Sequence, residues 1–237
     1  MAAQHDPVQN RLIAALPAAE ISPLLEVLEL VPMRLGEVLY RPGGLQQHAW
    51  FPTTAVVSLH HVTRSGACAE SSGVGREGMV GVAIYMGGDS TPSSAVVQAT
   101  GHGYRLARTA LVRAFERDAT LREVLLRYAQ ALITQIAQTV VCYRHHSIEQ
   151  QFSRLLLSTF DRSPPGDLVL TQDLVAGMLG VRRESITQAA IGLQQSGYIR
   201  YRRGHITVLD PAGLQRCACE CYGVVKRELQ RLLARPA

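Results

Sequence analysis

The chain has 237 residues, which fits two domains of ordinary size better than one large domain, because domains cluster near ~100–150 residues. Hydrophobic residues make up 47% of the sequence and charged residues 18%, a globular composition that argues against a disordered or fibrous chain. No apolar run reaches the ~20 residues of a membrane-spanning helix, and the N-terminus lacks the basic start and apolar stretch of a signal peptide. We therefore expect a soluble, cytoplasmic protein with no membrane contact.

The net charge of +5 is concentrated in one part of the chain. Residues 1–143 hold 11 Arg and 11 acidic residues, whereas residues 144–237 hold 13 Lys and Arg against 8 acidic residues. A neutral N-terminal part joined to a basic C-terminal part suggests that the C-terminal part binds a polyanion. The cysteines number five, and an odd number without an export signal argues against a disulfide framework.

The first part of the chain predicts short helices followed by a β domain. Residues 8–30 carry helical spacing that Pro17 and Pro23 break into short helices. From about residue 31 to residue 106, short apolar runs alternate with clusters of Gly, Pro and Ser at roughly 8–12-residue spacing. This pattern is typical of a β-barrel or sandwich and not of a parallel sheet.

A long helix is predicted next. Residues 121–143 contain neither Gly nor Pro, and a helix of about 23 residues extends for roughly 35 Å. It can pack on its own β domain, or it can form a dimer seam because it is long for a domain of this size; both interpretations stay open. A second helix over 148–160 ends before a loop at Pro164, Pro165 and Gly166. The apolar stripe of the long helix consists of Leu125, Leu132, Ile136, Val140 and Tyr143.

A winged helix-turn-helix is the clearest pattern in the C-terminal part. Thr171 can cap a helix over 172–179, and Gly180 permits a left-handed turn before a second helix over 183–195. In this motif the second helix enters the major groove of DNA, and the hairpin predicted over 198–209 adds the wing. The buried contacts of the motif come from Ala176, Val181, Ile186, Ala189, Ala190 and Leu193.

The exposed face of the second helix carries side chains that can read bases. Arg binds guanine O6 and N7, Glu accepts from cytosine N4, and Gln reads adenine N6 and N7. A solvated helical hairpin with incidental arginines is the alternative, which the turn glycine, the apolar set, the wing and the charge distribution disfavour. The candidates for base contacts are Arg183, Glu184, Ser185, Thr187 and Gln188. The candidates for phosphate contacts are Thr171, Gln172, Arg182, Arg202 and Arg203.

These residues resemble the Crp/Fnr family of bacterial transcription regulators. Residues 180–186, Gly-Val-Arg-Arg-Glu-Ser-Ile, are similar to the family's Gly-x-Ser-Arg-Glu-Thr-Val at the start of its recognition helix, and residues 34–40 resemble its early β hairpin. The resemblance implies an α+β chain with a cyclic-nucleotide-binding-type β jelly roll over 1–118, a dimerisation helix over 119–146 and a winged helix-turn-helix domain over 147–237. It also implies a non-enzymatic homodimer that binds a near-palindromic operator in double-stranded DNA and acts on RNA polymerase.

The effector site departs from the family pattern. Cyclic-nucleotide-binding members hold the ribose with a Gly-Glu-Leu segment and the cyclic phosphate with an Arg-Ser pair. In this sequence Met79 replaces that Glu and Ser93 replaces that Arg. A buried phosphate without its cation would be uncompensated, so we expect no response to cyclic AMP and a pocket that binds another ligand or none. The candidate pocket residues are Gly78, Met79, Gly81, Ser93 and Ser94.

Two other functions match parts of the sequence. Residues 73–78 fit the dinucleotide fingerprint Gly-x-Gly-x-x-Gly of a nucleotide-using enzyme, but no acid stands about 20 residues further on, and a glycine-rich loop of the β domain is the favoured interpretation. A protein-interaction module without DNA binding is the other alternative, and it predicts no salt-dependent affinity for duplex DNA. No catalytic residue is expected.

Cysteines and histidines form small groups near the C-terminal domain and in the β domain. Cys217, Cys219 and Cys221 are expected on one helix, where alternate residues cannot all converge on one metal ion, so buried thiols are favoured over a redox or metal sensor. Adjacent residues on a strand face opposite sides, so an adjacent histidine pair gives at most one ligand to an ion. We expect surface or hinge histidines, no bound metal and no resident cofactor. The pairs are His60–His61 and His145–His146.

Overall fold

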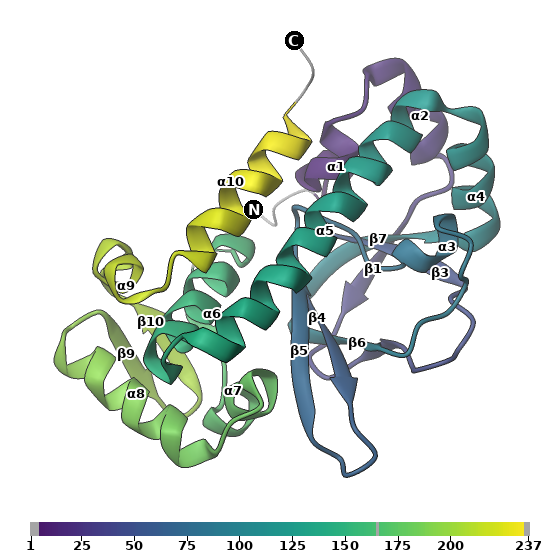
Figure 1. Ribbon diagram of the computed structural model, residues 1–237. Coiled ribbons are helices and arrows are strands. Elements are labelled where there is room, and N and C mark those ends of the chain that lie inside the picture. Colours follow the sequence, from purple (N-terminus) through teal and green to yellow (C-terminus); the bar gives the residue numbers. More distant parts are fainter. Residues whose placement is uncertain (1–4, 165, 235–237) are drawn as a thin grey trace.

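A computed structural model describes residues 5–164 and 166–234, which form a β domain, a long helix and a helical C-terminal domain (Figure 1). Residues 1–4, which the expected β domain includes, and Pro165 of the expected loop lie outside the described residues. None of the helices in the described ranges is both long enough and apolar enough to cross a bilayer. The mixed α and β architecture agrees with the fold class expected from the sequence.

Two antiparallel sheets face each other in the β domain. The chain enters it through η1 (Pro7–Gln9), α1 (Arg11–Ala14) and α2 (Ala18–Leu25). One sheet has the strand order β1 (Glu29–Met33), β7 (Gly101–Ala107) and β3 (His48–Pro52). The other has the order β2 (Val38–Tyr40), β6 (Ser94–Ala99), β4 (Val56–Val62) and β5 (Cys68–Val74). The short helix α3 (Val82–Tyr85) lies between β5 and β6 in the chain.

Two details of this region differ from the expectations. Residues 34–40 do not form a hairpin, because β1 pairs with β7 whereas β2 pairs with β6 in the other sheet. Gly36, at φ +81°, makes the turn that sends the chain from one sheet to the other. Pro23 does not break the helix but is the sixth of the eight residues of α2.

The long helix α5 (Ala119–His145) follows α4 (Arg108–Arg117) and packs along the β domain. The residues of the expected stripe divide into two groups. Leu125 and Leu132 are buried against their own β domain, whereas Ile136 and Val140 are 36% and 65% exposed. At 100° per residue the five residues lie within about 80° of one another, so their position along α5, and not the helical face, separates the buried from the exposed ones. Leu126 and Ile133 are also exposed, and with Val140 they recur every seven residues.

The C-terminal domain packs its helices and a small sheet around one apolar core. It begins with α6 (Ile148–Arg162), whose first turn Ser147 and Gln150 cap reciprocally. Then follow β8 (Leu168–Val169), α7 (Gln172–Leu179), α8 (Arg183–Gln195), β9 (Ile199–Arg202), β10 (His205–Val208), α9 (Pro211–Cys217) and α10 (Cys221–Leu233).

The C-terminal helix expected to carry all three cysteines is broken into two. The Asp210 side chain caps α9, but Ala218 adopts an extended conformation and ends that helix. The chain then turns, and α10 runs back along α5 (Figure 1). Residues 217–221 contain neither Gly nor Pro, so the sequence carries no local signal for this break.

Candidate nucleic-acid interface

The turn between α7 and α8 is built by one cap and one glycine. The Thr171 hydroxyl accepts a hydrogen bond from the Leu174 amide at 3.2 Å, which caps α7. Gly180 ends α7 at φ +66°, a conformation that a side chain disfavours, and the Val181 amide then bonds to the carbonyl of Ala176. The chain can therefore reverse within a few residues and start α8 across α7.

One face of α8 is anchored in the core, and this leaves the other face open. Ile186, Ala189, Ala190 and Leu193 are buried in the C-terminal core. Arg182 takes the N-cap position but makes no side-chain cap, because a guanidinium has no acceptor for the free amides of the first turn. On the outer face, Arg182, Arg183, Glu184 and Gln188 are exposed, and Ser185 and Thr187 are half-buried.

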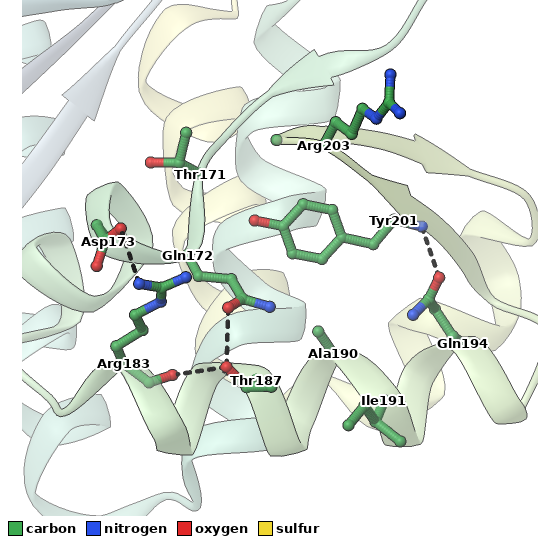
Figure 2. A pocket seen from close by; sticks show the side chains of 11 residues that line it. Thr171, Gln172, Asp173, Arg183, Thr187, Ala190, Ile191, Gln194, Tyr201 and Arg203 are labelled. Atoms are coloured by element: carbon green, nitrogen blue, oxygen red, sulfur yellow. Dashed lines mark hydrogen bonds and ion pairs between the residues drawn. The ribbon is translucent and has the colours of Figure 1, made fainter.

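A cavity of about 410 Å³ lies between α7, α8 and the wing (Figure 2). Arg183 reaches across it to Asp173, with 3.6 Å between Nη1 and Oδ2. The Thr187 hydroxyl donates to the Gln172 side-chain oxygen at 2.8 Å. Both members of the Arg183–Asp173 pair are more than half exposed, so the pair is weak and Arg183 can leave it for a stronger acceptor. Asp173 belongs to this site, but it was not predicted as a site residue. The only sequence signal for it is its place as an acid in the first turn of the helix over 172–179.

The wing is held against this cavity by Tyr201. Its backbone amide donates to the side-chain oxygen of Gln194 on α8 at 2.8 Å, and its hydroxyl donates to the Leu170 carbonyl at 2.8 Å. At the tip, Arg203 and Gly204 have φ of +51° and +81°, which is the conformation of a tight two-residue hairpin turn. Arg203 points away from the Tyr201 ring in Figure 2, and Arg202 is also exposed. The wing thus presents two guanidinium groups beside the open face of α8.

A family model described as the Crp-like helix-turn-helix domain matches residues 150–217, which span this site. The matched segment is thus a Crp-like helix-turn-helix domain, and the chain as a whole shares its fold with solved structures of Crp/Fnr regulators. Among curated proteins, none matches the sequence significantly.

Three solved structures illustrate the shared fold. FixK2 from Bradyrhizobium japonicum has 14% identity and a TM-score of 0.68, over 81% of this chain and 98% of that one. A CRP/FNR-family transcriptional regulator from Thermus thermophilus has 22% identity and a TM-score of 0.63, over 80% and 98%. The c-di-GMP-responsive global regulator CLP from Xanthomonas campestris has 12% identity and a TM-score of 0.62, over 81% and 99%.

The residues expected to line an effector pocket in the β domain are closely packed. Met79 is fully buried in the core, and the Tyr128 hydroxyl of α5 donates to its carbonyl at 2.9 Å. A Cβ at Gly78 would overlap the Tyr128 ring, and Gly81 makes the left-handed turn into α3 at φ +109°. Ser93 is buried with its hydroxyl 2.6 Å from that of Thr91, and the buried Ser94 begins β6.

The glycine-rich segment 73–78 serves a contact between domains. The element after it, α3, has only four residues, which is not the long helix of a dinucleotide site. A Cβ at Gly75 would lie 2.7 Å from the Cβ of Arg162 on α6, so the glycine lets α6 approach the loop. Arg162 Nε then lies 2.6 Å from Glu77 Oε1, and both side chains are nearly buried. Neither residue stands out in the sequence, because their pairing needs the fold.

Further contacts join the same two domains beside this ion pair. The Tyr143 hydroxyl at the end of α5 lies 2.9 Å from the Glu70 carbonyl on β5 and 3.0 Å from the Met178 carbonyl on α7. Burial raises the pKa of the Glu70 carboxyl. This rise is partly offset by a hydrogen bond from Ser58 and by the positive charges of Arg162 and Arg154. Tyr143, expected at a dimer seam, therefore connects parts of its own chain.

Proposed function

We propose that this protein is a sequence-specific DNA-binding transcription regulator that binds a near-palindromic operator as a homodimer. The observation that carries the proposal is the open face of α8, where Arg183, Glu184 and Gln188 are exposed beside the arginines of the wing. Side chains of these three types can read guanine, cytosine and adenine edges in the major groove. The match to a Crp-like helix-turn-helix domain supports this role for α8, because the second helix of such motifs lies in the major groove.

An experiment on Arg183 tests the base-reading role. A half-site is first selected from random duplexes, and binding of Arg183→Ala is then measured by fluorescence anisotropy. We expect a loss of roughly 1–3 kcal/mol on the selected site and relaxed discrimination at one base pair per half-site. Arg64→Ala, in the exposed loop between β4 and β5, is the matched control and should bind as the wild type does. Equal weakening on all sequences would contradict base reading, and a wild type without salt-dependent duplex affinity would contradict the proposal.

The homodimer is proposed from the exposed apolar residues of α5. Leu126, Ile133 and Val140 are 50%, 59% and 65% exposed and recur every seven residues, the spacing of a two-helix seam. A charge at the middle position should separate the protomers, so Ile133→Glu should give the monomer mass in light scattering. Val62→Glu, at the similarly exposed end of β4, is the control. A monomeric wild type, or a dimer that survives Ile133→Glu, would refute this seam.

We further propose that the β domain has lost cyclic AMP binding and that the chain is not an enzyme. Support comes from the filled space around Met79 and Tyr128 and from the role of residues 73–78 in holding Arg162. Calorimetric titration with cyclic AMP should show no saturable heat, and saturable binding at micromolar concentration would contradict the proposal. RNA polymerase as the partner and the cytoplasm as the location follow from the regulator role and are proposed with it.

A further inference from the structure

Three thiols and one imidazole converge where α5 meets α10. Cys142 comes from the last turn of α5, His146 caps that helix, Cys219 lies in the break between α9 and α10, and Cys221 begins α10. One ligand atom from each lies within 4.8 Å of each of the others. The three cysteines are at most 4% exposed and form their own buried cluster. The helix break explains how Cys219 and Cys221, two positions apart, come to share one centre.

The imidazole of His146 is oriented as a metal ligand would be. Its Nδ1 lies 3.5 Å from Cys221 Sγ and faces the thiols, and its Nε2 lies 3.2 Å from a carboxylate oxygen of Glu220. A histidine that binds a metal through one nitrogen usually gives its other N–H to a carboxylate, which fixes the ring. The Gln151 side-chain amide also holds the His146 backbone by donating to its carbonyl at 2.9 Å. His145, the adjacent histidine, is exposed and outside the cluster.

The donor set and its spacing select the class of ion. Three sulfurs and one nitrogen in a closed, buried centre are the donors of a structural zinc site. At a Zn–S distance of about 2.3 Å, tetrahedral thiolates lie about 3.8 Å apart. The Sγ atoms of Cys142 and Cys219 are 3.5 Å apart, which needs only a small adjustment. Thiolates that bind different irons of an iron–sulfur cluster are held further apart by the cluster itself, so this centre fits a single ion.

The surroundings also fit the charge of such a centre. Three thiolates and a divalent ion together carry a charge of about −1. The Gln138 amide donates to Cys221 Sγ at 3.1 Å, and hydrogen bonds of this kind stabilise a bound thiolate. Arg154 of α6 is buried, and its charge acts on Cys142, so a cation is present to balance the site.

We propose that Cys142, His146, Cys219 and Cys221 bind one zinc-class divalent ion per chain in a closed structural site. Binding releases the thiol protons to solvent and forms three metal–sulfur bonds and one metal–nitrogen bond, with no change of oxidation state. The ion would fasten the end of α5 to the start of α10, next to Ser147, which caps the first turn of α6. The proposal does not depend on DNA binding and is tested without DNA.

The test is a titration of the reduced full-length chain with Zn²⁺ and with Co²⁺ as a spectroscopic probe. We expect one ion per chain by elemental analysis and, with Co²⁺, the intense visible absorption of a tetrahedral thiolate site. Cys219→Ser and His146→Asn should each weaken binding at least tenfold in competition with a chromogenic chelator. Cys217→Ser and His145→Asn are matched controls, because each neighbours a ligand but lies outside the cluster, and both should bind as the wild type does.

A second readout keeps the test valid if a variant fails to fold. Alkylation followed by peptide mapping of the zinc-loaded wild type should find Cys142, Cys219 and Cys221 protected until a chelator is added, whereas Cys68 and Cys217 should react equally with and without it. Absence of a stoichiometric ion in the reduced protein would overturn the proposal, as would loss of the ion in Cys217→Ser. The proposal would also be overturned if, after reduction, Cys142 and Cys219 formed a disulfide again although Zn²⁺ was present. That result would assign the cluster to redox chemistry.

Discussion

The ion pair between Arg162 and Glu77 should be one of the main contributors to the stability of the domain junction. Their side chains are 11% and 10% exposed, and the buried Glu70 carboxyl lies within the field of the same guanidinium. Arg162→Met keeps the apolar stem but leaves carboxylates buried without this cation. Breaking a buried pair by removing one partner costs about 3–5 kcal/mol, which is a large part of a typical total stability of ~5–15 kcal/mol.

Urea unfolding of four proteins tests this reasoning. We expect a large drop in the unfolding midpoint for Arg162→Met and a partial recovery for the double variant Arg162→Met/Glu77→Gln, because the second change removes the unpaired charge. Glu123→Gln is the control, since the exposed pair of Glu123 and Arg127 should contribute less than about 0.5 kcal/mol. A double variant that is less stable than Arg162→Met, or a single variant no worse than the control, would refute the argument.

Substitutions at three other positions have defined outcomes. Arg203→Ala should weaken binding on every duplex and lower the slope of log K against log salt by about 1, and an unchanged slope would contradict a phosphate contact. Gly180→Ala places a side chain at φ +66° and should cost about 1 kcal/mol in urea unfolding, with a smaller loss for Gly180→Asn; equal stability would contradict the turn argument. Glu70→Gln should stabilise the protein at neutral pH. Because the pKa of the Glu70 carboxyl is higher in the folded chain than in the unfolded chain, where it is near 4.5, the wild type loses stability as the pH rises above about 4.5. The stability gained by Glu70→Gln should therefore fade below that pH. A gain that persists unchanged at pH 4 would contradict the assigned burial effect.

Local patterns in the sequence identify the elements of the helix-turn-helix closely. Thr171, Gly180 and the apolar residues of α8 act through neighbours within one or two helical turns, and the predicted ranges 172–179 and 183–195 agree with α7 and α8. The wing can be predicted for the same reason, since its turn needs Arg203 and Gly204 alone. Periodicity also locates α5, but which side of it faces the β domain depends on sheets that are distant in the sequence.

The contact between the two domains and the cysteine cluster cannot be predicted from local sequence, because both depend on tertiary structure. The pairing of Arg162 with Glu77 spans 85 residues, and no pattern near either residue indicates it. The expectation for the cysteines assumes one continuous helix through residues 217–221, and that assumption is wrong. Packing of α10 along α5 overrides the helical preference of residues 218–220, and it is this break that turns Cys219 toward Cys142.

Contacts near both ends of α6 hold the C-terminal domain against the rest of the chain. On one side, Arg162 pairs with Glu77. On the other, the proposed metal centre joins α5 to α10, and Lys226 of α10 is bonded in turn to Asp161 of α6 at 2.8 Å. A rotation of α6 about Ser147 would break the ion pair or strain the proposed centre, so a ligand that favoured the rotated state would have to bind it more tightly by at least that cost. If the proposed centre binds its ion, loss of that ion would remove one of these two constraints and make α8 easier to reorient.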